Sequence, residues 1–251
     1  MAGHNKWSKI KRQKAKEDKK KSKIWARLSR EIAVAAREGG GDPDMNATLA
    51  NAIERAEAEN MAKDTIERAI KRGTGELEGQ DYEPATYEGY APYGVAVFVE
   101  ALTDNTNRTV ADLRHLFGTY DGNLGKDGSV GYLFDRKGHF RIPADATDEM
   151  TLFEIVVEAG AEDLQHDDGA FVVTTSVDAY STVETALEEA ELEPEESGLI
   201  RIPTTTVSLD PSQEGTVRTL VEAIEDHDDV QAVYTTLEVN GEALAFSEDD
   251  A

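Results

Sequence analysis

The sequence predicts a multidomain α+β protein, with an N-terminal three-helix bundle followed by two ferredoxin-like α/β domains, one inserted in the other. Three observations lead to this fold class. Apolar residues recur at helical spacing between residues 24 and 75. From residue 95 onward, short apolar runs typical of strands alternate with helical segments. Between residues 138 and 203 these segments follow the order β-α-β-β-α-β of a ferredoxin-like unit.

Three short helices are expected in residues 24–78. The first should end at the glycine run 39–41, and the second should begin near Asp44 or Asn46, because either residue can cap a helix. The third carries Asp64 as its predicted cap and should end at Gly73. One apolar stripe on each helix should face the core of the bundle: Ile24, Leu28, Ile32 and Ala36; Leu49, Ile53 and Ala56; Ile66 and Ile70.

The elements after the bundle are predicted from local patterns. Residues 95–102 are almost continuously apolar, which indicates a central strand buried on both faces. The polar turn at residues 167–169, which lies between two strand-like runs, indicates a hairpin. Further strands are expected near residues 130–134, 139–142, 199–202, 205–209 and 230–239, and helices at residues 108–120, 148–159, 178–191 and 213–226.

These elements divide the chain into four parts. Residues 1–23 form a basic arm and residues 24–78 form the helical bundle. Residues 138–203 form a complete ferredoxin-like domain. The flanking segments, residues 82–137 and 204–246, each follow the order β-α-β, so together they predict a second ferredoxin-like domain that receives the first. Insertion is physically acceptable because the ends of a domain often lie close together.

Charge is distributed unevenly along the 251 residues, whose formal net charge is −25. Residues 1–37 contain 13 Lys or Arg against 3 Asp or Glu, whereas the rest of the chain contains 13 against 48. The simpler interpretation of the acidic part is a halophile-like adaptation to a salty cytoplasm. The alternative is an acidic body that binds a basic partner or a metal ion. In both cases the positive charge collected at one end predicts an interaction element.

The basic arm predicts nucleic-acid binding. Lysine and arginine neutralise phosphates and release condensed counterions, which supplies most of the sequence-independent affinity for DNA or RNA. Trp7 can stack on an unpaired base. In isolation the arm should be disordered or a frayed helix, since its cations repel one another, and a merely solvated tail is the alternative. The predicted binding residues are Lys6, Trp7, Lys9, Lys11, Arg12, Lys14, Lys16, Lys19, Lys20, Lys21, Lys23, Arg27 and Arg30.

Other chemistry has weaker support. The chain has no cysteine, and none of its 5 histidines is spaced as in a zinc-binding helix. Residues 122–129 are glycine-rich but lack the spacing and the following helix of a phosphate-binding loop, so they predict a turn. The remote alternative is a metal-dependent enzyme that uses Asp104, Asp228 and Asp229. A protein-interaction adaptor is a further alternative. We therefore expect no enzyme activity and no cofactor.

Several segments resemble the YebC/PmpR family of transcriptional regulatory proteins. The resemblance covers nearly the whole chain, although Ala62 stands where the family usually has proline. The matching segments are MAGHNKWSKIK (1–11), REIAVAA (30–36), GGDP (40–43), NMAKDTIERAIKRGTG (60–75), YEGY (87–90), GVAV (94–97), LTDN (102–105), NRT (107–109), GNLG (122–125) and DDVQ (228–231).

The resemblance implies a three-domain, non-enzymatic protein that regulates transcription by binding DNA. The family also resembles the mitochondrial activator of cytochrome oxidase translation and is linked to easing ribosome stalls at proline runs. A ribosome-associated translation factor that binds ribosomal RNA is therefore the alternative function. The expected partners are DNA, ribosomal RNA or both, in the cytoplasm, with no membrane and no small-molecule substrate. The sequence leaves the oligomeric state open and is compatible with a monomer.

The motif-bearing loops provide a candidate second contact surface. A purely structural role for their glycines and for Asn107 is the alternative. The surface consists of Tyr87, Tyr90, Asn105, Asn107, Arg108 and Asn123.

Overall fold

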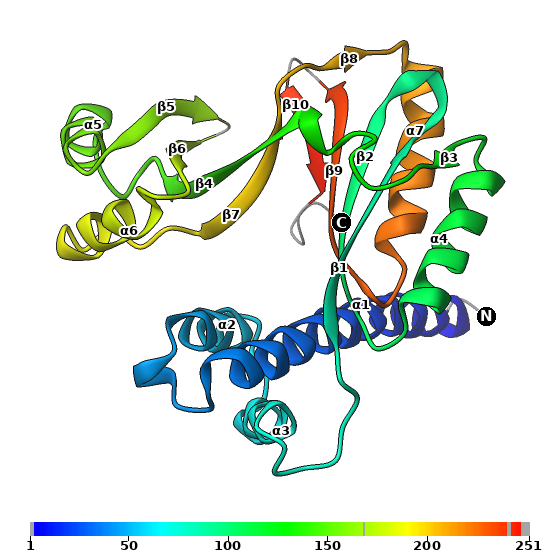
Figure 1. Ribbon diagram of the computed structural model, residues 1–251, viewed down its shortest axis with the longest axis horizontal. Helices are drawn as coiled ribbons and strands as arrows, with labels where there is room; N and C mark the ends of the chain where they lie inside the picture. The colour runs from blue at the N-terminus through cyan, green and yellow to red at the C-terminus, as the bar shows by residue number, and fades with distance from the viewer. Residues whose placement is uncertain (1–2, 168, 240–241, 247–251) are drawn as a thin grey trace. The chain divides into compact units, whose positions relative to one another are not determined.

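The computed structural model describes the backbone of residues 3–167, 169–239 and 242–246, and the side chains of residues 21–167 and 169–238. Within these residues the fold is mixed α+β, with seven α-helices and two sheets (Figure 1). The chain divides into two compact units. Unit 1 consists of Met1–Val130, Val207–Leu237 and Leu244–Ala251, and unit 2 consists of Gly131–Thr206 and Glu238–Ala243.

The N-terminal part of unit 1 is a bundle of three helices, α1 (Gly3–Gly39), α2 (Ala47–Ala58) and α3 (Lys63–Gly73). Their predicted apolar stripes meet in one core, which confirms the helical periodicity. Leu28, Ile32, Ala36, Leu49, Ala56 and Ile66 are buried there, and Ile24, Ile53 and Ile70 pack against its edge. The end of α3 at Gly73 is also confirmed.

Asn46 joins the first two helices of the bundle. Its side-chain oxygen accepts a hydrogen bond from the backbone N–H of Leu49 at 3.1 Å, which caps α2 as predicted. Its side-chain nitrogen donates to the carbonyls of Ala35 and Gly40, both at 2.8 Å, near the end of α1. One buried amide therefore satisfies the ends of two helices, with the short 3-10 turn Pro43–Met45 between them.

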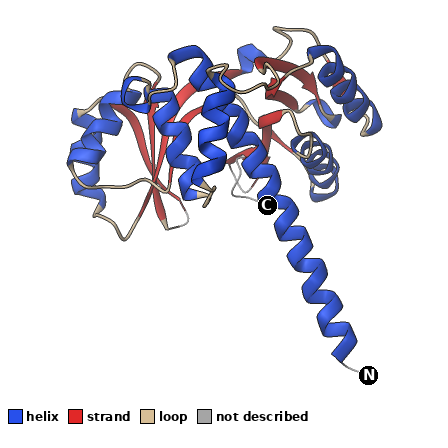
Figure 2. Cartoon of the chain, turned by 90° about the horizontal axis from the view of Figure 1, so that it is seen from below, coloured by secondary structure: helices blue, strands red, loops and turns tan. Residues whose placement is uncertain are grey.

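Two predictions about helix starts differ from the structure. Helix α1 begins at Gly3 and runs without a break through the expected boundary between arm and bundle, and its N-terminal turns extend away from the rest of unit 1 (Figure 2). No glycine or proline interrupts residues 4–38, and several of them are strong helix formers. The cap predicted at Asp64 is wrong, because Ala62 holds the capping position of α3 and Asp64 lies in the first turn.

The α/β part of unit 1 is built on a six-stranded sheet, in which the strand order is β10-β9-β2-β1-β3 and β8 pairs with β9. Strand β2 lies in the middle, between β1 and β9, which confirms the prediction of a buried central strand. The strands are β1 (Glu83–Tyr90), β2 (Ala96–Thr103), β3 (Asn123–Leu124), β8 (Val207–Ser208), β9 (Val230–Val239) and β10 (Glu242–Phe246).

The sequence interpretation missed β1 and treated residues 87–90 as a loop. Pro84 and Gly89 obscure the strand pattern, but both are accommodated here. Strand β3 pairs only with Gly89 and Tyr90, so the edge of β1 beside Pro84 is open and needs no N–H donor. The ferredoxin-like order predicted for this domain is wrong, because β1 occupies the place beside β2 that the strand at residues 205–209 should take.

Helices α4 (Thr106–Thr119) and α7 (Pro211–Glu225) contact each other and lie against this sheet (Figure 1). Each begins at a side-chain cap, Asn105 for α4 and Asp210 for α7. Their buried side chains fill the core: Leu113, Phe117, Val217, Leu220, Val221 and Ile224. A further 3-10 turn, Pro92–Gly94, connects β1 to β2.

Unit 2 contains a four-stranded antiparallel sheet with the order β5-β6-β4-β7. Its elements are β4 (Phe134–Pro143), α5 (Glu149–Glu158), β5 (Ala161–Asp167), β6 (Ala170–Ser176), α6 (Tyr180–Glu189) and β7 (Glu196–Pro203). The expected hairpin is confirmed, since Asp167 pairs with Ala170; Asp168 itself lies outside the described residues. Phe140, Ile142, Leu152, Val156, Phe171, Val173, Val183 and Leu187 form the core.

The two strands expected near residues 130–134 and 139–142 are one strand. Residues 131–133 form a 3-10 turn, and β4 then continues from Phe134 to Pro143. Gly138 resembles a break in the strand pattern, which is why the sequence predicted two strands. A Cβ atom there would lie 2.7 Å from the ring of Tyr180 and would overlap the hydroxyl of Thr175, so glycine fits the close packing within the strand.

Replacing Gly73 with alanine should destabilise the bundle by about 2–3 kcal/mol. The new Cβ would overlap the carbonyl oxygen of Ala33 and lie 2.8 Å from the Cβ of Ala36, so α1 and α3 would have to move apart. The matched control is Gly215→Ala in α7, where nothing lies within 4 Å, and which should stabilise by about 0.5–1 kcal/mol. Chemical denaturation measures both, and equal effects would contradict the close packing of α1 on α3.

Candidate nucleic-acid interface

The predicted arm is the first half of α1. Its side chains through residue 20, which include Lys6, Trp7, Lys9, Lys11, Arg12, Lys14, Lys16, Lys19 and Lys20, lie outside the described residues. The helical backbone nevertheless fixes their order around the axis. Positions 9, 12, 16, 19 and 23 follow a spacing of three and four residues, which places them on one face. Positions 27 and 30 continue the same stripe.

The C-terminal end of this stripe is bound within unit 1. Lys23 forms an ion pair with Asp226 at 2.7 Å. Arg27 donates to the carbonyl of Glu225, and Arg30 donates to the carbonyl of Asp228. These acceptors lie at the last residue of α7 and just beyond it, where unpaired carbonyls and the helix dipole favour cations. The described part of the basic stripe therefore attaches α1 to the end of α7.

This arrangement changes the roles available to two predicted contact residues. Arg27 is buried, and the guanidinium of Arg30 also lies over the ring of Tyr82, 5.3 Å from its centroid. Both side chains are committed to internal partners. Lys21, in contrast, is exposed and its ammonium lies 5.1 Å from the ring centroid of Trp25. The cations that remain candidates for phosphate are thus N-terminal to Lys23.

Asp229 fixes the turn to which α1 is attached. Its carboxylate accepts hydrogen bonds from Thr109 at 2.7 Å, from Thr103 at 3.2 Å and from the guanidinium of Arg108 at 2.7 Å. Its backbone carbonyl accepts from the N–H of Leu102 at 2.8 Å. Burial alone would raise the pKa of Asp229, but the bonds from Arg108 and Thr109 outweigh it and lower that pKa. The carboxylate is thus held ionised where β2, α4 and β9 meet.

The sequence suggested Asp104, Asp228 and Asp229 only as metal ligands. In the structure the oxygens of Asp229 face a guanidinium and two hydroxyls, and Asp104 pairs with Arg108 at 2.8 Å. Asp228 is exposed. Among the described side chains, no group of three or more His, Asp or Glu could hold a metal ion. No helix in the described part of the chain is long and apolar enough to cross a membrane.

Five of the six residues of the candidate second surface fall into two groups. Tyr90 and Asn123 pair across β1 and β3, one strand position from Gly89. A Cβ on Gly89 would lie 2.7 Å from the carbonyl oxygen of Asn123, so this glycine is needed for packing. Asn105, Asn107 and Arg108 lie at the start of α4, where the Asn105 side chain caps the helix.

A groove of about 500 Å³ lies between β1, the start of α4 and residues 124–127, and of the six surface residues only Tyr87 lines it. Tyr87, the remaining member of the surface, lines it from β1, and Thr106 and Val110 line it from α4. The exposed Lys126 lies on its other side, on a loop held by the carboxylate of Glu88, which accepts from the N–H groups of Gly128 and Val130 at 2.9 and 2.6 Å. The groove therefore combines an aromatic ring, apolar side chains and a cation with the acidic residues Glu88 and Asp127.

Helix α3 carries cations that the sequence interpretation did not single out. Lys63, Arg68, Lys71 and Arg72 are exposed and make no ion pair with any described residue. The sequence contained a signal for them, because lysine is scarce after residue 37: only four lysines follow it, and two of these are on α3.

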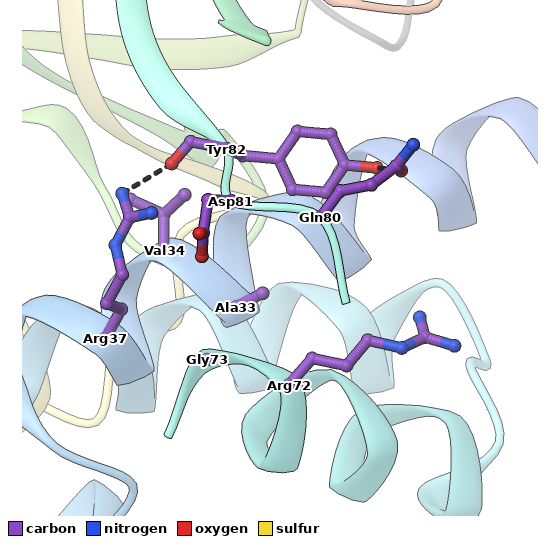
Figure 3. A pocket seen from close by; sticks show the side chains of 8 residues that line it. All are labelled: Ala33, Val34, Arg37, Arg72, Gly73, Gln80, Asp81 and Tyr82. Carbon is purple, nitrogen blue, oxygen red and sulfur yellow. Dashed lines mark hydrogen bonds between the residues drawn. The ribbon is translucent and has the colours of Figure 1, made fainter. Parts of the chain in front are cut away.

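A cleft of about 10 Å³ lies between α1, the end of α3 and residues 80–82. In this cleft Arg37 donates to the carbonyl of Tyr82, whereas the side chain of Arg72 is directed away from Arg37 (Figure 3). The cleft is too small for a ligand, so its residues serve packing.

The fold and the basic helix α1 define a class of protein. It is a multidomain α+β protein in which positive charge is concentrated in the helical N-terminal domain. The sequence model of the TACO1/YebC protein N-terminal domain matches residues 5–76, and that of the TACO1/YebC second and third domain matches residues 82–237. The chain belongs to the TACO1/YebC family.

Relatives and a solved structure support this assignment. A probable transcriptional regulatory protein of Salinibacter ruber is 63% identical, over 100% of this chain and 98% of the relative. One of Persephonella marina is 49% identical, over 97% and 98%. The crystal structure of a conserved hypothetical protein from Aquifex aeolicus is similar with a TM-score of 0.80 at 43% identity, over 89% of this chain and 92% of that one.

Replacing Asp229 with alanine should destabilise unit 1 by about 2–4 kcal/mol. The change removes the carboxylate that accepts from Thr103 and Thr109 and pairs with Arg108, although the Thr109 hydroxyl keeps the carbonyl of Asn105 as an acceptor. Asp228→Ala alters the exposed neighbouring side chain and is the control, with an expected change below about 0.5 kcal/mol. Thermal and denaturant unfolding provide the comparison. If both variants proved equally stable, Asp229 would not fix the turn.

A second prediction concerns pH, because burial raises the pKa of Glu225 to about 7, against the opposing charges of Arg27 and Lys23. The folded state therefore binds the proton of Glu225 more tightly than the unfolded state does. The protonated carboxyl makes its full contribution to the free energy of unfolding below about pH 4.5, and this contribution is lost as pH rises toward 7. Glu225→Gln removes this titration. It should be more stable than the original chain by about 1–2 kcal/mol at pH 8, after allowance for partial exposure.

The difference should shrink to nothing near pH 4.5 when unfolding is measured across the pH range. Gly215→Ala, which changes the same helix without altering a titratable group, is the control, and its stability difference should not depend on pH. A stability difference for Glu225→Gln that stays constant with pH would refute the assignment.

Proposed function

We propose that this protein is a cytoplasmic, non-enzymatic regulator of gene expression that binds nucleic acid through the N-terminal half of α1. A DNA-binding transcriptional regulator of the YebC/PmpR type is the first form of the proposal, and the names of the relatives support it. One observation carries it: residues 1–37 have a net charge of +10 in a chain whose remaining residues have a net charge of −35.

The geometry of the arm suits a phosphate backbone. Residues 3–20 rise by about 27 Å as a helix, and a helix of ordinary diameter fits the major groove of DNA. Positions 9, 12, 16 and 19 share one face of this helix, and position 7 is close to its N-terminus, where a tryptophan would be able to stack on an exposed base. The acidic remainder repels phosphate, so contact should concentrate on this helix.

The proposed architecture keeps the inserted domain but gives the ferredoxin-like description to unit 2 alone. The order β5-β6-β4-β7, with two helices in the pattern β-α-β-β-α-β, supports that description. In this arrangement unit 2 interrupts the α/β part of unit 1 between Val130 and Val207. The acidic composition remains best interpreted as adaptation to salt.

A ribosome-associated factor that binds ribosomal RNA is the second candidate. The groove between β1 and α4 favours it, because single-stranded RNA is recognised through splayed bases that stack on aromatic side chains. Tyr87 could receive such a base and Lys126 its phosphate. Asn107 and Asn123 are exposed, but they do not line the groove. The remaining residues of the second surface, Tyr90, Asn105 and Arg108, would position this groove.

The arm is tested by replacing Lys9, Arg12, Lys16 and Lys19 with glutamine in the full chain. Affinity for a DNA duplex and for a ribosomal RNA fragment, measured by fluorescence anisotropy, should fall by at least ten-fold at moderate salt. The slope of log K against log salt should become shallower by up to about 0.9 for each DNA phosphate that the variant no longer neutralises.

The matched control replaces the four exposed cations of α3, Lys63, Arg68, Lys71 and Arg72, with glutamine. It removes the same charge and should weaken binding much less. If both quadruple variants lose affinity equally, net charge rather than the arm governs binding and the proposal fails. Crosslinking in cells followed by sequencing separates the two forms: ribosomal RNA without promoter DNA would reject the transcriptional form.

A further inference from the structure

Helix α5 of unit 2 has an apolar stripe on its outer face. Met150, Phe153 and Val157 are 69%, 49% and 48% exposed, and their spacing of three and four residues places them on one side of the helix. On the opposite side, Leu152 and Val156 are fully buried in the core of unit 2. The helix therefore has two apolar faces, and folding of unit 2 uses only one of them.

This second face stands out against the composition of its surroundings. Residues 131–206 contain 18 Asp or Glu and 4 Lys or Arg, so negative charge dominates this part of the chain. Single exposed apolar residues are ordinary on a protein surface. Three neighbours on one helix face, in a domain otherwise so rich in charge, are typical of a contact surface.

Acidic residues border the stripe on both sides. At 100° per residue, Glu149 lies on one flank, and Glu154 and Glu158 lie on the other. All three are exposed, and none forms an ion pair with a described residue. A partner that covers the apolar stripe would therefore also meet two rows of negative charge.

We propose that this face of α5 binds a basic amphipathic helix of a partner protein. The pattern of Met150, Phe153 and Val157 matches the a, d and a positions of a heptad, so a partner helix with apolar residues at the same spacing can pack alongside it. Lysine or arginine beside that partner's apolar stripe would meet Glu149, Glu154 and Glu158, and would fix orientation and exclude acidic competitors.

The same charges reject other occupants. Nucleic acid and anionic membrane surfaces are repelled by the acidic flanks. A second copy of α5 would bring like charges together along both edges of the seam, which is unfavourable. The site lies wholly within unit 2 and does not depend on the nucleic-acid interface proposed for α1.

The test uses the full chain and a labelled synthetic helix of about three heptads, with leucine at the a and d positions and lysine beside them. Two control peptides are used: one has the same composition with the stripe scrambled, and the other has glutamate in place of lysine. We expect saturable binding of the first peptide by fluorescence anisotropy at physiological salt. The scrambled and acidic peptides should bind at least ten-fold more weakly.

Matched protein variants locate the site. The double variant Met150→Gln and Phe153→Gln should weaken peptide binding by at least ten-fold, and circular dichroism should report unchanged folding because both side chains are exposed. Tyr132→Gln changes a 71% exposed residue elsewhere in unit 2 and should stay within two-fold of the original chain. Affinity for DNA should be unaffected in all of them.

Three results would overturn the proposal. If the double variant bound the peptide as tightly as the original chain, the stripe would not be the binding site. If the scrambled peptide or the acidic peptide bound equally well, binding would not depend on the spacing of the apolar residues or on the charge pairing. A dimer in sedimentation velocity that the double variant converts to a monomer would assign the stripe to a second copy of the chain.

Discussion

The buried carboxylate of Asp229 is the interaction on which the arrangement of unit 1 depends. Within four residues of the end of α7, it gathers the end of β2 through Thr103 and the start of α4 through Arg108 and Thr109. A carboxylate with 4% of its side chain exposed tolerates ionisation only because each neighbour donates to it. The same turn exposes the carbonyls that receive Arg27 and Arg30. One buried negative charge therefore holds the turn to which the basic helix is attached.

The local sequence pattern was sufficient to predict those elements whose stabilising contacts repeat at a fixed period. The stripe of Leu28 and Ile32 on α1, the cap at Asn46 and the unbroken apolar run of β2 are all present as expected. Pattern failed where tertiary packing overrides a residue's usual preference. Gly138 and Gly89 resemble breaks in the sequence, yet each lies inside a strand because a neighbouring side chain or backbone occupies the space of its missing Cβ.

The candidate site shows the same limit more sharply. In the sequence, Arg27 and Arg30 are indistinguishable from Arg12, since all three belong to one basic stripe. What separates them is a set of carbonyls 198 residues further along the chain, and no local pattern connects the two segments. Asp229 likewise looked like one acid in a group of three, although only Asp229 is buried. Net charge by segment could be predicted from the sequence, but the partner of each charge could not.

The division of the basic stripe also limits where phosphate can bind. Its C-terminal part is bound by the end of α7, through the Asp226 carboxylate and the Glu225 carbonyl, and this carboxylate would repel a nucleic acid placed beside it. The N-terminal turns of α1, in contrast, extend away from the rest of unit 1 (Figure 2). In molar salt the screening length falls to about 3 Å, so both the attraction of the arm and the repulsion by the acidic body act only at contact distance. Long-range steering is then lost, and affinity must come from the groups that touch. The proposed interface has basic residues at positions 9, 12, 16 and 19 on one face of a helix and Trp7 near its N-terminus, so it would retain direct ion pairing and stacking under such conditions, whereas a diffuse distribution of charge would not.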